Sequence, residues 1–481
     1  MSELNVNLVN HLTSAQVTAL TTAQVRALTA TQLQAMQQVQ ISGLDTADIA
    51  VMSSQQVRQL SATQLQFMNT AQIRAIGPDS MAGLTADALN GLDEERIRAL
   101  ETSQVRMLNA SQLNALREYQ LSSMETIDIA SLNTQALPSV SPQQLRKLSS
   151  AQVGALTTAQ LRVLTTDQLQ QLTPSQIRAL TTAAVNALSD DQVANLTYLQ
   201  LAALGTDRIS ALPPTGLMAM SSLALRGLGS AQINALSTTQ IKALSAAQIG
   251  QLFALQVGAL STAAVAALKP DQVGVLSAAQ VSAMNTQSLA SISPAALPSL
   301  SNAAITALTT AMSQALTTTQ IKALTTQQIG AMAAMSQPAL SVNQINAMSN
   351  EQVTKVGGWL SATLTTNAAS LLPSTMGQLS ADFITGLAPG AVANLTSSQI
   401  QMMGTQQLQA LTTSQLASMS TDQLRSFTRA QFIESYRVLP SSSPSLMNKL
   451  ISLTTGSTPV MTSSDLNTWY GADLRAAVST P

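Results

Sequence analysis

The sequence lacks cysteine and has few charged or aromatic residues. Without cysteine, the 481-residue chain can have no disulfides, thiolate metal sites or cysteine nucleophiles. Only 9% of its residues are charged and 2% are aromatic, whereas about a quarter of an ordinary globular chain is charged. The 22 basic and 23 acidic residues nearly cancel, so the chain lacks the basic surface that general nucleic-acid binding requires. Its hydrophobic content of 45% is too high for a charged disordered tail.

Membrane and export signals are also missing. No uninterrupted apolar run approaches the ~18 to 20 residues that a membrane helix needs, so we expect no transmembrane segment. Residues 1–7 lack the basic segment and the apolar core of a signal peptide. An extracellular or cell-surface location would therefore require export without a cleaved leader, and a cytoplasmic location is the alternative.

What the sequence does contain is a repeat of eight residues. From Gln16 to Gln352, every eighth position is Gln in 27 of 43 cases, and we name it the glutamine position. The next residue, the first anchor, is aliphatic or Met in 41 of 43 cases. The second anchor, three residues later, is apolar in all 43, and the cap position that follows it is usually Ser, Thr, Asn or Asp. Such regularity indicates one structural unit copied many times.

Residues 21–28 show the physical meaning of each position. Thr21 and Gln24 have the spacing of a capping box, in which the Thr hydroxyl binds the N3 amide and the Gln side chain reaches back to the N-cap amide. Val25 and Leu28 then lie on one face of a short helix. In a continuous helix this apolar face would rotate by about 80° per octad, and in a strand the two anchors would lie on opposite faces.

We therefore predict an all-α fold, a superhelical α-solenoid of short capped helices with one helix per eight-residue repeat. Isolated helices of this length are unstable in water, so stacking against neighbours must supply the stability. The repeat does not specify the hand of the superhelix. Our simplest expectation for each turn is about two octads, a small helical hairpin.

Interruptions of the repeat suggest domain boundaries. Near residues 357–379 the pattern shifts by one residue, because Leu372 is followed by Leu379 after seven residues. The predicted segments are an N-terminal arm (1–11), an octad-repeat solenoid (12–356), a joint with the register shift (357–379), a second octad array (380–439) and an atypical C-terminal cap or docking tail (440–481). Rare aromatic residues mark the joint and the tail, and Trp359, Trp469 and Tyr470 are candidate docking residues.

Residues suited to catalysis are scarce. His11 is the only histidine and has no evident partner, and the acidic residues 93–95 fit the start of a helix, where negative charge is favourable. No nucleotide-binding or nucleophile motif is present. We expect no enzymatic activity, no catalytic, cofactor-binding or metal-binding residues, and no cofactor.

Two repeated polar positions have both a structural and a functional interpretation. Basic residues concentrate directly after the first anchor, where a fixed position would become a stripe along the solenoid. This possible contact stripe comprises Arg26, Arg58, Arg74, Arg98, Arg106, Arg146, Arg162, Arg178, Arg226, Lys242, Lys322 and, in the shifted register, Arg425. It is either a solvated position that supports solubility or a contact line for a neighbouring subunit or an acidic polymer. The Gln amides either cap helices only or also form lateral hydrogen bonds between chains.

Residues 156–160 (LTTAQ) and 236–244 (LSTTQIKAL) carry a resemblance to known repeats. The pattern L-[ST]-x-x-Q-[IVL]-x-A resembles the octapeptide repeats of bacterial surface and adhesin-like proteins, over roughly residues 12–435. The rhythm of short capped helices is also similar to the superhelical mesothelin and stereocilin group. Both resemblances imply a non-enzymatic extracellular or surface role.

These observations predict a structural repeat protein that associates with itself into a filament, sheath or scaffold, at a bacterial surface or outside the cell. The expected partner is another copy of the chain, and a different surface protein is a further possibility. The alternative is a monomeric α-solenoid binding module or adhesin that holds a protein or peptide on its concave face. The low aromatic content disfavours that alternative, because aromatic residues dominate binding hot spots.

Overall fold

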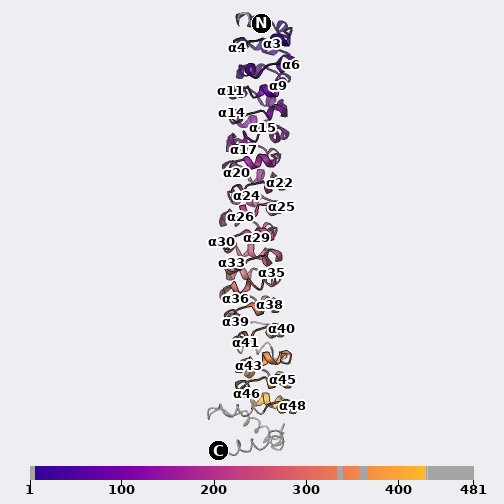
Figure 1. Ribbon diagram of the computed structural model, residues 1–481, viewed down its shortest axis with the longest axis vertical. Coiled ribbons are helices and arrows are strands. Elements are labelled where there is room, and N and C mark those ends of the chain that lie inside the picture. Colours follow the sequence, from indigo (N-terminus) through magenta and orange to yellow (C-terminus); the bar gives the residue numbers. More distant parts are fainter. Residues whose placement is uncertain (1–5, 333–339, 357–363, 365–366, 429–430, 432–481) are drawn as a thin grey trace, which may run out of the picture. The chain divides into compact units, whose positions relative to one another are not determined.

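The computed structural model describes residues 6–332, 340–356, 364, 367–428 and 431 (Figure 1). Within these residues every regular element is a helix of three to seven residues, and there is no β-strand. Neighbouring helices follow one another at intervals of about one octad, separated by corners. The predicted all-α fold of short helices is therefore confirmed. The chain divides into two compact units, Met1–Leu244 and Ser245–Pro481, and this boundary falls inside the predicted 12–356 array.

From residue 6 onward, unit 1 contains 29 α-helices and one 3₁₀ helix. Their bounds are α1 (Val6–Val9), α2 (Ser14–Thr18), α3 (Thr22–Arg26), α4 (Ala30–Ala35), α5 (Gln38–Gly43), α6 (Thr46–Ala50), α7 (Ser54–Val57), α8 (Ala62–Phe67), α9 (Thr70–Ala75), α10 (Pro78–Met81), α11 (Ala86–Leu89), α12 (Glu94–Arg98), α13 (Thr102–Val105), α14 (Ala110–Ala115), α15 (Glu118–Ser123), α16 (Thr126–Ser131), η1 (Leu137–Ser139), α17 (Pro142–Lys147), α18 (Ser150–Gly154), α19 (Thr158–Val163), α20 (Thr166–Gln171), α21 (Pro174–Ala179), α22 (Thr182–Asn186), α23 (Asp190–Ala194), α24 (Tyr198–Ala203), α25 (Thr206–Ala211), α26 (Pro214–Ala219), α27 (Ser222–Leu225), α28 (Ser230–Asn234) and α29 (Thr238–Ala243).

Unit 2 continues the same pattern in its described residues. Its elements are α30 (Ala246–Gln251), α31 (Ala254–Gly258), α32 (Thr262–Ala266), α33 (Pro270–Gly274), α34 (Ala278–Ser282), α35 (Thr286–Ser291), η2 (Leu297–Ser299), α36 (Asn302–Thr306), α37 (Thr310–Ala315), α38 (Thr318–Ala323), α39 (Thr326–Met332), α40 (Val342–Asn346), α41 (Asn350–Val356), η4 (Ala368–Ser370), α42 (Pro373–Met376), α43 (Ala381–Gly386), α44 (Pro389–Ala393), α45 (Ser397–Gln401), α46 (Thr405–Ala410), α47 (Thr413–Ser418) and α48 (Thr421–Arg425).

Helix α3 shows why each octad starts and stops where it does. The Thr21 hydroxyl accepts from the Gln24 amide at 3.3 Å, and the Gln24 Oε1 accepts from the Thr21 amide at 2.9 Å. This reciprocal pair satisfies two amides that a helix start leaves free, so the predicted capping box is confirmed. Where proline follows the first anchor, as at Pro138 and Pro298, the octad forms the 3₁₀ helices η1 and η2 instead.

Successive helices wind into a coil in each unit. In unit 1, α18 packs on α21 and α23 on α26; in unit 2, α31 packs on α34. Side-chain hydrogen bonds between adjacent turns join residues 25 to 31 apart, for example Thr18 to Gly43 and Gln56 to Val25. One turn therefore holds about 28 residues, or three and a half octads, and the expectation of two octads is wrong. The reason is that each corner redirects the chain by much less than the near-reversal of a helical hairpin.

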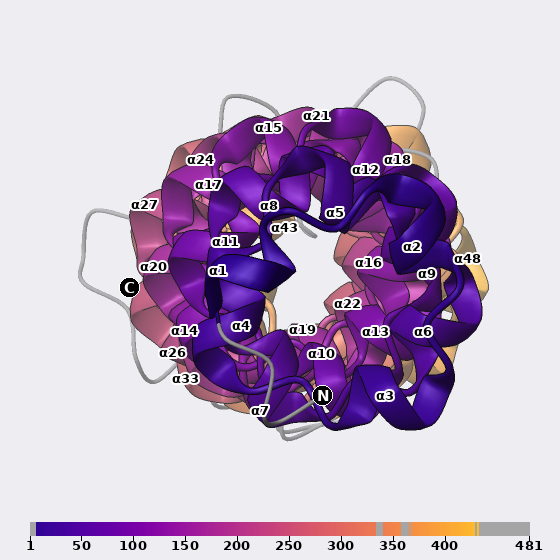
Figure 2. The same cartoon turned by 90° about the horizontal axis from the view of Figure 1, so that it is seen from above.

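The hand of the coil is visible in unit 1. Figure 2 shows unit 1 from its amino-terminal end, where α4, α5, α6 and α7 follow one another clockwise while the chain recedes from the viewer. A path that turns clockwise as it recedes is a right-handed superhelix. The helices of unit 1 thus follow a right-handed coil, a property that the repeat did not specify.

The two anchors of each octad form the core. Leu113 on α14 is fully buried and Leu116, at the end of the same octad, is 3% exposed. The same pattern recurs along both units, with first anchors buried almost completely and second anchors nearly so. Burial of two aliphatic side chains per octad against the adjacent turns supplies the stability that an isolated two-turn helix lacks.

The shift of register lies one octad earlier than the sequence suggested. Leu371 is buried at 3% exposure, whereas Leu372 is 50% exposed, so the seven-residue step runs from the buried Leu364 to Leu371. The stack persists here, because Asn346 donates to the Ser370 carbonyl at 3.1 Å and accepts from the Leu372 amide at 2.8 Å. An octad of this coil can thus be one residue shorter while the contact between turns is kept.

Several predicted segments fall partly or wholly outside the described residues. The N-terminal arm is described from Val6, where α1 begins, and the joint is described at residue 364 and from residue 367 onward. Trp359, Trp469 and Tyr470, with the C-terminal tail, lie outside the described residues. The predicted domain boundaries and docking residues stay predictions.

Candidate functional site, a ladder of buried glutamines

The Gln side chain of each octad bonds in two directions. On α15, the Gln120 Oε1 accepts from the Arg117 amide at 2.8 Å and so caps its own helix. Its Nε2 donates to the carbonyls of Leu89 and Leu92 in the preceding turn, at 2.9 and 2.8 Å. Gln120 is fully buried. One side chain therefore closes a helix start and joins two turns of the coil, and all its bonds lie within the chain.

This arrangement repeats through both units, and we name it the glutamine ladder. Each member donates from Nε2 to the carbonyl 28 residues earlier, which belongs to a second anchor in most cases. Members include Gln40, Gln56, Gln64, Gln72, Gln104, Gln112, Gln120, Gln144, Gln152, Gln160, Gln168, Gln176, Gln192, Gln200, Gln232 and Gln240 in unit 1, and Gln280, Gln320, Gln328, Gln344, Gln352, Gln399, Gln407, Gln415, Gln423 and Gln431 in unit 2.

The ladder contradicts the interpretation that the Gln amides form lateral hydrogen bonds between chains. Lateral hydrogen bonds between chains would require exposed amides, but the ladder members are at most 9% exposed and donate to their own backbone. The amide groups of the ladder members already donate to backbone carbonyls inside the coil. They therefore form the contact between turns and are not a surface for other chains.

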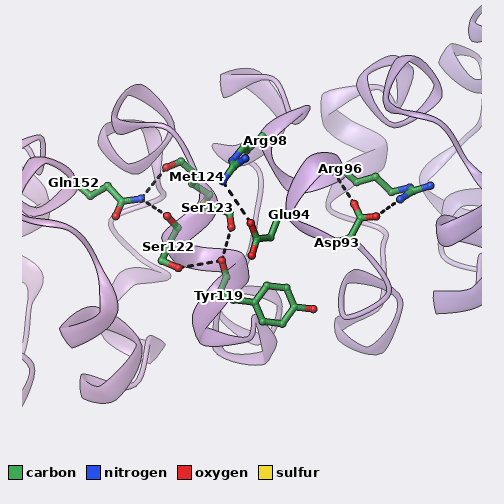
Figure 3. A network of polar contacts seen from close by, with 9 residues as sticks. All are labelled: Asp93, Glu94, Arg96, Arg98, Tyr119, Ser122, Ser123, Met124 and Gln152. Carbon is green, nitrogen blue, oxygen red and sulfur yellow. Dashed lines mark hydrogen bonds and ion pairs between the residues drawn. The ribbon is translucent and has the colours of Figure 1, made fainter.

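Other donors replace Gln at some ladder positions. The Ser80 hydroxyl donates to the Met52 carbonyl at 2.8 Å, and Arg96 Nε donates to the Met68 carbonyl at 2.7 Å. Figure 3 shows Arg96 also paired with Asp93, the N-cap of α12, and, in another part of the view, the ladder member Gln152 donating to the Met124 carbonyl. Arg208 makes the equivalent bond to Leu180. Each of these three replacements donates to a carbonyl 28 residues earlier, so each keeps the bond between turns that Gln makes elsewhere.

One stretch of unit 2 lacks amide donors for slightly more than a turn. Four successive ladder positions there are occupied by Ser288, Ala296, Ala304 and Met312. All four side chains are buried, and the Ser288 hydroxyl has no hydrogen-bond partner. Here the turns are held together by apolar packing instead of by the ladder.

The basic residues after the first anchor occupy exposed sites between turns. Arg162 Nε donates to the carbonyl of Ala187 in the next turn at 3.2 Å, and Arg74 pairs with Glu101 at 2.8 Å. Because a turn holds about three and a half octads, this position faces different sides of the coil in successive octads. In unit 1 the basic residues therefore wind around the coil and do not form one straight stripe. Their role in contacting a partner stays a prediction.

A substitution of Arg162 tests whether this position matters for stability. The Arg162→Ala variant should lower the free energy of unfolding by no more than about 1 kcal/mol, because an exposed side chain with one backbone bond contributes little. Urea denaturation followed by circular dichroism measures the difference. A loss comparable to that of a buried anchor would show that the basic residues are essential to the stack.

Isolated polar groups offer little for catalysis. His11 is exposed, and Asp93 Oδ1 accepts from the Arg96 amide at 2.9 Å, as expected for an N-cap. Among the described residues, no group of three or more His, Asp or Glu side chains is placed to hold a metal ion. Two carboxyls are unusual because they are buried at ladder positions: burial raises the pKa of Asp48 and of Asp128.

Comparison with known families identifies the repeat. The family model described as the ALTTAQ repeat matches residues 41–78, 129–166, 141–174, 162–198, 209–246, 234–262 and 254–286. These matches fall in regions where the structure shows octads, so the chain is a repeat protein. A comparison with curated proteins found no match. Across the described part of the chain, no helix has the length and apolar character needed to span a membrane.

Proposed function

We propose that this chain is a non-enzymatic structural protein that associates with copies of itself into a filament, sheath or scaffold. The observation that supports this most is the internal use of the repeated polar groups. Cap hydroxyls bind helix amides and ladder amides bind the preceding turn, as at Thr157 and Gln160. The cap and ladder groups therefore hold the coil together and are not available to a ligand.

Exposed apolar side chains supply a contact surface for association. In unit 1, Leu199 is 62% exposed and Leu223 is 70% exposed, each directly before a ladder position. They lie on α24 and α27, which pack against each other, and Tyr198 on α24 is also exposed. Large apolar side chains gathered on a surface mark interaction sites. The net charge of −1 adds no long-range repulsion between copies.

Sedimentation velocity and light scattering over a range of protein and salt concentrations test this proposal, and negative-stain microscopy shows whether polymers form. The wild-type chain should form oligomers. The double variant Leu199→Ser and Leu223→Ser should weaken them by about tenfold or more in dissociation constant, because each leucine contributes apolar area. The matched control is Ala183→Ser, an exposed residue at the same octad position, and it should change nothing.

Two results would contradict self-association. A chain that stays monomeric at every protein and salt concentration would contradict the proposal. A foreign protein or peptide captured at fixed stoichiometry would favour the alternative, a solenoid that binds a partner on its concave face.

We also propose that the protein acts at a bacterial surface or outside the cell. The resemblance of its octads to bacterial surface repeats supports this location. Protease treatment of intact cells, followed by detection of the protein, tests it: the surface location requires cleavage without lysis, and complete protection would contradict it.

A further inference from the structure

Two ladder positions of unit 1 hold aspartate instead of glutamine. Asp48 on α6 is 1% exposed and Asp128 on α16 is 3% exposed. The Oδ2 of Asp48 is buried and has no hydrogen-bond partner. A carboxyl group in such a place needs an explanation, because an unpaired buried charge is strongly unfavourable.

From the bonds of the other ladder members we infer which groups these carboxyls face. A ladder residue faces the carbonyls 28 and 31 residues earlier, as Gln56 faces Leu28 and Val25. For Asp128 the equivalent carbonyls are those of Leu100 and Ile97. Carbonyl oxygens accept hydrogen bonds and cannot donate them. An ionised carboxylate has no proton to offer, whereas a protonated carboxyl has one O–H and can take over the role of the amide.

Charged groups around Asp48 do not compensate its charge. Helix α6 packs on α3 and α9, whose only charged residues are Arg26 and Arg74, both exposed. The N-cap residue Asp45 accepts from the Asp48 amide at 2.7 Å, which places a second carboxyl nearby. Desolvation by burial is the main cause that raises the pKa of Asp48, and the charge of Asp45 raises it further, whereas a hydrogen bond from the Asp45 backbone to the Asp48 carboxyl lowers it.

Asp128 has a similar environment. Helix α16 packs on α13 and α18. Its acidic neighbours are Glu125, the N-cap of α16, and Glu101, the N-cap of α13. The basic residue on these elements is Arg106, at the end of α13. Burial raises the pKa of Asp128 most; the backbone bond to Glu125 lowers it, and the charges of Glu125 and Glu101 raise it.

We propose that Asp48 and Asp128 are proton-operated members of the ladder, so that acidification tightens the coil at these two places. On protonation each carboxyl becomes a donor toward the preceding turn, and its buried charge disappears. The unfolded chain takes up these protons only near the ordinary pKa of Asp, about 3.9. The contribution of both residues to stability is therefore lowest at high pH, rises as the pH falls through their raised folded-state pKa, and levels off below the ordinary value.

Amide hydrogen exchange of residues 97–105 and 126–132 tests this, with wild type and variant compared at the same pH. The Asp128→Gln variant restores a ladder amide, so these residues should exchange on the order of tenfold more slowly than in wild type at pH 8. At pH 4 the difference should shrink, because the raised pKa of Asp128 makes a larger fraction of the wild-type carboxyl protonated there than at pH 8. The control Asp167→Asn changes an exposed carboxyl and should alter exchange at neither pH.

A converse variant keeps the test independent of the native sites. Gln120→Asp places a carboxyl at a normal ladder position. Amides near it should exchange faster than in wild type at pH 8, and this excess over the wild-type rate should be smaller at pH 4. The proposal is overturned if Asp128→Gln and wild type differ equally at both pH values, or if Gln120→Asp opens the coil to the same extent at both.

Discussion

Replacement of Gln120 by leucine should lower the free energy of unfolding by about 3 kcal/mol, as measured by urea denaturation. Leucine fills a similar volume but cannot bond. The amide of Arg117 and the carbonyls of Leu89 and Leu92 would each lose a partner in a buried place. Each such loss is worth about 1 to 3 kcal/mol, so their sum exceeds what a lost helix cap alone would cause.

Gln24→Leu is the matched control for this effect. Gln24 occupies the same octad position and its Oε1 accepts from its own N-cap amide in the same way, but Gln24 is exposed. Its loss should lower the free energy of unfolding by about 1 kcal/mol, the usual contribution of a cap. Equal losses in the two variants would show that the bonds to the preceding turn contribute nothing.

Replacement of Leu113 by alanine should lower the free energy of unfolding by about 2 to 5 kcal/mol. Leu113 is a fully buried first anchor on α14, which packs against α11 and η1 in the adjacent turns. Truncation leaves a cavity between the two turns, and the atoms that line it lose their contacts. Urea denaturation followed by circular dichroism measures the loss.

The matched control is Ile127→Ala, because Ile127 belongs to the same unit and is 61% exposed. This change should alter the free energy of unfolding by less than about 0.5 kcal/mol, as expected for a surface substitution. If Leu113→Ala were equally mild, the first anchors could not be the main source of stability between turns.

The sequence predicted those parts of the fold that depend on neighbouring residues. Thr21 and Gln24 are three residues apart, and so are Val25 and Leu28, so capping and the shared apolar face follow from local geometry alone. The number of octads per turn depends on the angle at each corner and on contacts between residues about 28 apart. No local rule contains that angle, which is why the expectation of a hairpin was wrong.

The second function of the Gln side chain left a signal in the sequence that capping does not explain. Glutamate is as suitable as glutamine in a capping box. Yet none of the 43 glutamine positions from Gln16 to Gln352 holds glutamate. A carboxylate can accept from the N-cap amide but cannot donate to a carbonyl of the preceding turn. The absence of glutamate therefore points to a donor role, and Arg96 and Arg208 at the same position fit it.

The ratio of octad to turn has a consequence for how such a coil can change in length. Within a unit, each octad advances the chain by 8 residues of a turn of about 28, a rotation of roughly 100° about the coil axis. Inserting or deleting one octad would preserve every type of core contact but would rotate all later side chains to another side of the coil. Only a change of seven octads, about two full turns, would return them to their original direction. The number of octads in a unit therefore also determines which surfaces at the two ends of that unit point the same way.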